Sequence, residues 1–211
     1  MPLQNRVDPF SRIHAHPARG LFVGNRGILH DPETRLLKHQ RWATEGWVIC
    51  TLAPLPNAAP RPGLMLPGRW TELFFLDEAV GLAAGHRPCH ACRLQEARAF
   101  RDAAGADSAS ALNDAIAGEM KRYLRARAPE GRPACDPRTL PDGAFFAVGG
   151  LAYLKWGDAA FEFGFDGYAP PTPLPDAAQR LTPEISCRAL RNGYRPTVHP
   201  TLKRMRTRDR T

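Results

Sequence analysis

The sequence predicts an α+β fold, with strands and helices in different stretches of the chain. Short β-branched and aromatic runs are typical of strands, whereas residues 94–128 carry apolar side chains at helical spacing. Three further aromatic-rich runs, separated by glycine-containing turns, predict a small antiparallel β-unit with a helix after it. We therefore expect small strands with a cysteine-containing turn, two central helices, the β-unit and a C-terminal helix.

The first third of the chain predicts few regular elements. Proline and glycine are too frequent in residues 1–35 for a long helix, although residues 21–23 and 28–29 suit short strands. The β-branched, apolar residues 47–52 predict a buried strand. The proline-rich residues 53–69 predict an irregular loop.

A second strand and a short helix are expected next. Residues 71–76 are strand-like, and Asp77 after them suits the N-cap of a helix. Glu78 in the first turn suits the positive end of the helix dipole, and Gly85 is placed to end the helix in the left-handed conformation. Asp77 and Glu78 are therefore better explained as helix-start residues than as a catalytic acid pair.

Two central helices follow from apolar spacing. Residues 94–104 predict the first, and residues 110–128 predict the second, with Ser110 as its N-cap. The second carries an apolar residue at every fourth position, namely Leu112, Ile116, Met120 and Leu124. Residues 129–137 are rich in proline and glycine, which places a boundary between subdomains there.

In the C-terminal part of the chain the spacing of apolar residues changes from a helical pattern to short strand-like runs. Its aromatic runs are residues 144–148, 152–156 and 161–165, and residues 167–175 are expected to be a proline-rich connector. Thr182, Pro183 and Glu184 then have the order of an N-cap, a first-turn proline and a first-turn acid, and the helix they open ends at Asn192 and Gly193.

Three parts of the chain are expected from this pattern. Residues 1–128 should form the region with the cysteine turn and the central helices, and residues 138–200 the β-unit with its helix. Residues 201–211 should form a disordered basic tail, which carries Lys203, Arg204, Arg206, Arg208 and Arg210.

Two segments share one plan. Residues 76–89 and residues 181–197 each contain a capped helix, a glycine, an aromatic or imidazole ring, an arginine and a proline. Glycine followed by proline is a common way to stop a helix, so the shared tetrapeptide needs no function to explain it. Duplication with loss of the cysteines is the alternative.

The chain is basic, with a formal net charge of +8 and a pI near 9.7. A basic balance favours anionic partners such as nucleic acid. The 25 arginines against 4 lysines also follow from a GC-rich genome, which gives the charge no function. The N-terminus has no signal-peptide pattern and no apolar run reaches 18 residues, so we expect a cytoplasmic protein without a membrane span.

The cysteines carry the clearest chemical signal. There are five, an odd number, which argues against a disulfide framework in a cytoplasmic protein. Cys89 and Cys92 have the C-x-x-C spacing of a zinc half-site. A redox pair has the same spacing but usually opens a helix, whereas this pair follows Pro88 and a helix end, which favours metal; structural thiols are the third alternative.

A family resemblance rests on residues 74–93, FFLDEAVGLAAGHRPCHACR. They resemble the second half of the zinc-binding domain of the Ada DNA alkylation-repair proteins, a strand and helix followed by a G-[aromatic]-R-P-C-x-x-C-R zinc knuckle. The resemblance implies a structural Zn²⁺ and a role on DNA. More widely, the chain resembles an uncharacterised bacterial protein family of similar length, which implies no activity.

The chain departs from the Ada pattern upstream of the knuckle. Ada-like domains supply two further ligands from a Cys-x3-Cys pair, one of which accepts a methyl group from a DNA phosphotriester, but here only Cys50 is present. We expect Cys50 and a histidine to complete the site. His30 is the first choice, because Asp31 could support its ring, and His39 and His90 are alternatives.

Cys50 therefore has three readings. It is a plain ligand, a buried strand cysteine, or the metal-activated thiolate of a methyl acceptor. The arginines Arg87 and Arg93 flank the knuckle and could contact phosphates, and Arg26 lies in a glycine turn that could bind an anion. The alternative is that these arginines make structural hydrogen bonds within the protein and that the glycine turn binds no anion.

Three functions are compatible with these features. The leading hypothesis is a zinc-stabilised, nucleic-acid-associated protein. The second is an enzyme, either a metal-assisted nucleic-acid hydrolase or a thiolate methyl acceptor, which requires an open or reactive metal position. The third is a structural or protein-interaction module. The sequence indicates no oligomeric state.

Overall fold

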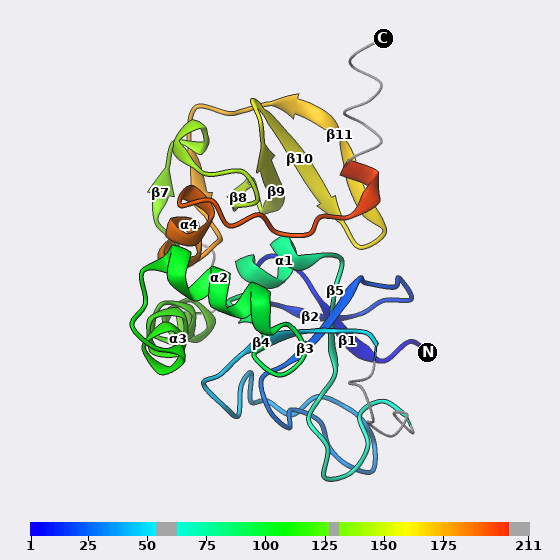
Figure 1. The fold of residues 1–211 in the computed structure, drawn as a ribbon. Coiled ribbons are helices and arrows are strands. Elements are labelled where there is room, and N and C mark those ends of the chain that lie inside the picture. Colours follow the sequence, from blue (N-terminus) through cyan, green and yellow to red (C-terminus); the bar gives the residue numbers. More distant parts are fainter. Residues whose placement is uncertain (54–62, 127–130, 203–211) are drawn as a thin grey trace.

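The computed structural model describes residues 1–53, 63–126 and 131–202, and it has the α+β fold that the sequence predicts. Two mainly antiparallel sheets are stacked along the molecule, with helices between and beside them (Figure 1). The helices are α1 (Glu78–Ala83), α2 (Leu94–Ala104), α3 (Ala109–Ala126) and α4 (Glu184–Arg191), with a short 3-10 helix at Pro137–Thr139.

The first sheet contains the strands that precede α2. Its strands are β1 (Gln4–Val7), β2 (Ile13–Ala15), β3 (Phe22–Asn25), β4 (Val48–Thr51), β5 (Leu73–Phe75) and β6 (Arg87–Pro88), in the order β2-β1-β5-β3-β4-β6. Two pairs are parallel, β1 with β5 and β4 with β6. The second parallel pair positions the cysteines.

The second sheet is the antiparallel β-unit. Its strands are β7 (Ala134–Cys135), β8 (Phe145–Val148), β9 (Leu151–Trp156), β10 (Ala159–Gly164), β11 (Gly167–Pro173) and β12 (Ala178–Arg180), in the order β11-β10-β9-β8-β12-β7. Gly149 and Gly150, with φ of +57° and +82°, form the two-residue turn between β8 and β9.

One hydrophobic core joins the two sheets. It contains Phe75 and Leu82 of the first part together with Phe145 and Leu190 of the second, all at most 1% exposed. Every residue of α1 is buried, and α2 packs against α4 (Figure 1). The two predicted units therefore share their interior. The boundary predicted at residues 129–137 falls partly outside the described residues.

Glu78 connects the two units through buried polar contacts. Its carboxylate lies 2.9 Å from Arg93 Nη2, and it accepts hydrogen bonds from the Tyr194 hydroxyl and, at 2.9 Å, from Thr197 N. Glu78 N in turn donates to Thr197 O. Glu78 is thus more than a helix-start residue, because its side chain fixes the segment after α4 against α1.

Asp77 caps α1, as predicted, and also contacts the second unit. Its Oδ1 accepts from Val80 N at 3.0 Å, and its Oδ2 accepts from the Tyr168 hydroxyl at 2.7 Å and from His199 N at 2.9 Å. Burial raises the pKa of the Asp77 carboxyl to about 6, although these three donors favour its ionised form.

Both copies of the repeated plan end their helices in the same way. Gly85 and Gly193 have φ of +83° and +100°, which glycine adopts without strain. The next residue closes the turn in each case, since His86 N donates to Gly81 O at 2.9 Å and Tyr194 N to Ala189 O at 3.0 Å. The shared tetrapeptide is therefore a helix-stop device.

Several predicted boundaries were wrong. The expected connector at 167–175 contains β11, where alternate backbone groups pair with β10 despite the prolines of an edge strand. Residues 28–29 are not a strand. Thr182 does not cap α4, because its hydroxyl accepts from Phe145 N at 2.8 Å. Residues 63–69 are irregular, as expected, whereas residues 54–62 and the basic tail from 203 onward lie outside the described part.

Candidate metal centre

Three of the five cysteines meet at one point of the first sheet. The sulfur atoms of Cys50, Cys89 and Cys92 lie within 4.8 Å of one another, and each side chain is half-buried. The cluster could hold a metal ion. The other two cysteines lie elsewhere, Cys135 on β7 and Cys187 inside α4.

The pairing of β4 with β6 brings the cluster together. These strands run parallel, with Val48 opposite Arg87 and Ile49 opposite Pro88. Cys89 N then donates to Ile49 O at 3.0 Å, which places Cys89 beside Cys50. Ile49 is fully buried against α1, so alternation along the strand turns Cys50 to the other face of the sheet.

A tight turn adds the third sulfur. Arg93 N donates to Cys89 O at 2.9 Å, and Ala91 N lies 3.4 Å from Cys89 Sγ. These bonds form a turn at residues 89–93, just before α2 begins, and the turn brings Cys92 close to Cys89. The C-x-x-C spacing thus works as a knuckle and does not open the helix.

The donor set suits a tetrahedral thiophilic ion. Two sulfurs bound at about 2.3 Å to a tetrahedral Zn²⁺ are about 3.8 Å apart, which agrees with the observed limit of 4.8 Å. Among the described residues, no histidine or carboxylate joins the three sulfurs at that distance. The described protein therefore offers three ligands and leaves a fourth position without a side chain.

Hydrogen bonds link the three thiols of the cluster. The Cys50 thiol donates toward Cys89, and this bond, with backbone donors of the turn, lowers the pKa of Cys89 to about 5. The same bond, together with burial, raises the pKa of Cys50. One negative charge is thus easily accommodated, whereas three adjacent thiolates need a cation to offset their repulsion.

His30 is not part of the cluster, which corrects the prediction for it. Its ring is buried between other partners, with Nδ1 2.7 Å from Thr71 Oγ1 and Nε2 3.2 Å from Leu66 O. Both ring nitrogens are thus engaged. The alternatives His39 and His90 do not join the three sulfurs either, and His90 Nδ1 lies 3.1 Å from Arg87 Nη1.

Arg26 is not available to a nucleic acid, contrary to the prediction. It is fully buried, donates to Ser11 Oγ at 2.6 Å and lies 4.7 Å from the centre of the Trp47 ring. Its Nε is 3.3 Å from His86 Nε2. Burial lowers the pKa of Arg26 to about 9 and holds that of His86 well below its usual range.

Arg87 and Arg93 are also structural, which corrects the other two predicted phosphate contacts. Arg93 is 3% exposed, pairs with Glu78 and lies over the Phe22 ring. Arg87 is 7% exposed and donates to Asn113 Oδ1 at 2.7 Å and to Pro88 O at 3.0 Å. Their side chains attach the knuckle to α1 and α3 and do not form a phosphate-binding surface.

Sequence reasoning missed a buried imidazole close to the knuckle. His86 packs its ring between Trp47 and Phe75, at 5.7 Å and 4.7 Å between ring centres. Within the described residues its Nδ1 has no hydrogen-bond partner. The helix-stop tetrapeptide did not indicate these contacts of His86. The ring at the equivalent position, Tyr194, has a different partner, since its hydroxyl donates to Glu78.

The chain matches no family model, no curated protein and no solved structure in comparisons with each. In the part that the structure describes, no helix combines the length and the apolar character required to cross a bilayer. The interpretation of the cluster therefore rests on its own geometry.

Proposed function

We propose that the protein holds one Zn²⁺ ion with Cys50, Cys89 and Cys92 and that the site is reactive, as an acceptor of alkyl groups on sulfur. The observation that carries this proposal is the set of three half-buried sulfurs, with no fourth side-chain ligand among the described residues. Structural zinc sites almost always have four protein ligands, whereas reactive sites have three and keep one position open.

The ligand set itself supports sulfur chemistry. All the ligand atoms that the described residues bring together at the cluster are sulfurs. The thiolates are themselves nucleophiles. A zinc ion bound here would keep the three sulfurs deprotonated and leave them accessible to an electrophile.

Methyl transfer from a phosphate ester to a cysteine sulfur needs no third reactant. A sulfur lone pair attacks a methyl carbon, an S–C bond forms, and the C–O bond to a phosphate ester breaks. The electron pair of that bond leaves with the phosphate oxygen. We assign the acceptor role to Cys50, because in the Ada-like pattern the accepting thiolate is a ligand upstream of the knuckle, and Cys50 holds that place here. The reducing cytoplasm in which we expect the protein keeps these thiols from oxidising.

Methyl uptake can be measured directly. Zinc-loaded protein incubated with trimethyl phosphate should gain the mass of one methyl group in place of one proton, and peptide mapping should place it on Cys50. Cys135, which is also half-buried, is the internal control and should react at least about tenfold more slowly, because burial raises the pKa of its thiol. Equal modification of Cys135, or none at the cluster, would refute the alkyl-acceptor role.

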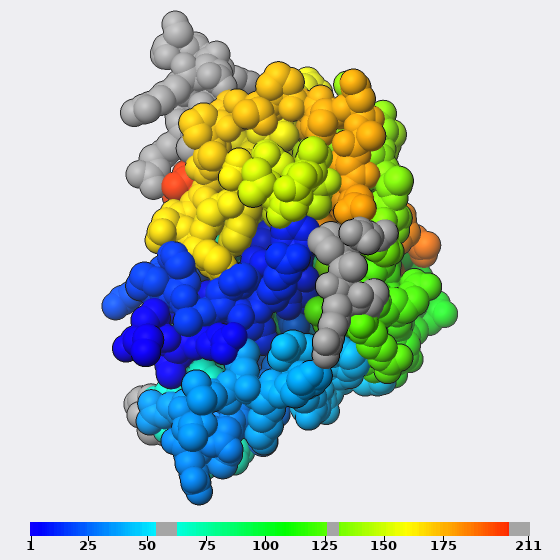
Figure 2. Space-filling view, turned by 180° about the vertical axis from the view of Figure 1, so that it is seen from behind, coloured from blue at the N-terminus to red at the C-terminus, as the bar shows by residue number. Residues whose placement is uncertain are grey.

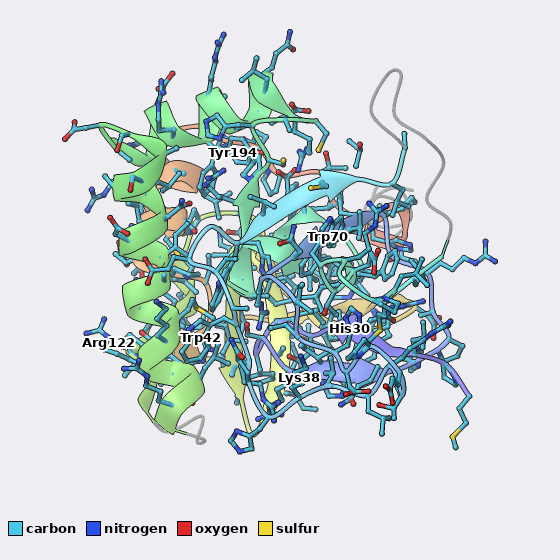
Figure 3. The ribbon with its side chains drawn as sticks, turned by 90° about the horizontal axis from the view of Figure 1, so that it is seen from below. His30, Lys38, Trp42, Trp70, Arg122 and Tyr194 are labelled. Atoms are coloured by element: carbon cyan, nitrogen blue, oxygen red, sulfur yellow. The ribbon has the colours of Figure 1, made fainter. Side chains whose placement is uncertain are left out.

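Nucleic-acid association is a second candidate, favoured by a different surface. Exposed cations occur on the loop before β4 and on α3, which contact each other through Glu45 and Lys121, namely Arg35, Lys38, Arg41, Arg122 and Arg125. Trp42 lies among them, with Lys121 and Arg125 over its ring (Figure 3). A basic surface with an aromatic side chain suits a nucleic-acid backbone.

The salt dependence of DNA binding tests this second candidate. If three to five of these cations contact phosphates, the logarithm of the binding constant should fall with the logarithm of salt concentration with a slope of about −3 to −5. Arg125→Gln should reduce the slope by about one. A slope near zero would remove nucleic acid from consideration.

A further inference from the structure

A cavity of about 380 Å³ lies away from the cysteines, between three segments of the chain. Its walls come from the turn between β1 and β2, from the loop around residues 37–41, and from the end of α3 with Arg132 beyond it. In Figure 2 the lighter blue surface adjoins both the dark blue and the green surface. Its volume is in the range of small-molecule sites, about 300–1,000 Å³.

The described lining of the cavity is strongly positive. It includes Arg12, Arg41 and Arg132, and no carboxylate lies among the described lining residues. Asp8 and Glu119 lie close enough to raise the pKa of Arg132, but their hydrogen bonds go to other donors. Asp8 accepts from Arg12 N and lies 2.9 Å from the His14 ring, and Glu119 accepts from the Tyr123 hydroxyl, Arg180 and Glu184 N. No described carboxylate is within 4.0 Å of any of the three guanidinium groups.

Arg132 is fixed in place at the base of this site. It is 7% exposed, donates to Leu181 O at 2.8 Å and to Phe10 O at 3.4 Å, and lies 4.5 Å from the centre of the Tyr123 ring. A guanidinium has five N–H donors, so the carbonyls leave some of them for another acceptor. Burial lowers its pKa to about 10, which still leaves the group charged at neutral pH.

A buried guanidinium beside two others is unfavourable unless an anion compensates it. The rest of the lining is apolar, with Phe10, Ile13, Leu37 and Leu124. We propose that this cavity binds an organic phosphate, with the phosphate between Arg12, Arg41 and Arg132 and the organic group against the apolar wall. Arginine suits this role, because its fork of donors matches the oxygens of a phosphate. The inference does not depend on the metal centre.

Phenyl phosphate is a suitable probe, since it combines a dianion with a ring. Calorimetric titration of the whole protein in 0.15 M salt should show one site with a Kd below about 1 mM, and inorganic phosphate should bind more weakly because it lacks the apolar group. Arg12→Gln and Arg41→Gln should each weaken phenyl phosphate binding about tenfold or more, as the loss of a charge-assisted hydrogen bond implies. Both side chains are exposed, so we expect the variants to fold, which a thermal melt checks.

Arg188→Gln is the matched control. Arg188 is an exposed arginine in the last turn of α4, and it does not line the cavity. Binding should be unchanged in this variant. The absence of saturable phenyl phosphate binding, or an equal loss in Arg188→Gln, would overturn the proposal.

Two sources of the phosphate are distinguished in the same titration. A free nucleoside monophosphate and a short oligonucleotide with a 5′-phosphate present the same group, and the oligonucleotide with a 5′-hydroxyl serves as reference. Binding of the mononucleotide alone assigns a small-molecule ligand. Binding of the 5′-phosphorylated but not the 5′-hydroxyl oligonucleotide assigns a nucleic-acid end. Failure of both, with phenyl phosphate also unbound, counts against the site.

Discussion

Replacing Glu78 by glutamine should lower the free energy of unfolding by about 3–5 kcal/mol. The carboxylate is 1% exposed and pairs at 2.9 Å with Arg93, which is itself 3% exposed. The amide keeps the size of the side chain but leaves the buried Arg93 guanidinium with only Glu96 as a counter-charge, a half-exposed carboxylate 3.8 Å from its Nε. It also replaces one of the two oxygens that accept from Tyr194 and Thr197. Urea denaturation of both proteins measures the difference.

Glu45→Gln is the control for this change. Glu45 forms an ion pair with Lys121, but its side chain is 62% exposed, so the same substitution should cost less than about 1 kcal/mol. If Glu78→Gln proves as mild as Glu45→Gln, the buried network does not hold α1 and the segment after α4 together. Retained helix signal in both variants would show that the comparison is made between folded proteins.

Removing zinc should be the second large effect. The ion would join β4 to the knuckle more strongly than the backbone hydrogen bonds between them, such as that from Cys89 N to Ile49 O. Binding to the folded state alone stabilises a protein by about 4 kcal/mol when free ligand exceeds its Kd a thousandfold. A chelator should therefore lower the free energy of unfolding by about this amount, and added zinc should restore it.

Two cysteine variants make this test specific. Cys89→Ser should bind less than about a tenth of the zinc of the original protein, and the chelator should then have no further effect. Cys135→Ser removes a half-buried thiol outside the cluster and should keep both the zinc and its stabilisation. A chelator effect that persists in Cys89→Ser would place the metal elsewhere.

Local sequence patterns predicted those elements that local energetics decide. The helix predicted at 94–104 has these bounds in the structure, and the strands β8, β9 and β10 lie within about two residues of the predicted runs. Asp77 caps α1, and Gly85 ends it with a positive φ. Each of these depends on residues that are close in the sequence, such as a cap and its helix or a glycine turn and its hairpin.

Long-range pairing is what the sequence did not reveal. The strand β6 has only two residues, one of them a proline, so no alternation marks it. The same pairing with β4 brings Cys50 to Cys89, which the sequence indicated only by residue type. The α+β class was nevertheless correct, because it needs only the kinds of elements and their segregation along the chain.

The arginines also show that the sequence did not reveal contacts between residues far apart in the chain. Arg26, Arg87 and Arg93 were predicted to meet phosphates, but all three are at most 7% exposed. Their partners are distant in the chain, as with Arg26 and His86 or Arg93 and Glu78. The arginines that do surround a cavity, Arg12, Arg41 and Arg132, belong to no motif. Charge in a sequence therefore did not indicate which side chains are accessible.

X-ray absorption at the zinc edge measures whether three thiolates hold the zinc ion and leave one position open. Protein loaded with one zinc ion should show three sulfur neighbours at about 2.3 Å and one lighter neighbour at about 2.0–2.1 Å. Added imidazole should replace the lighter neighbour and leave the sulfurs in place. Four sulfur neighbours, no sulfur neighbours, or a lighter neighbour that imidazole cannot displace would contradict the claim.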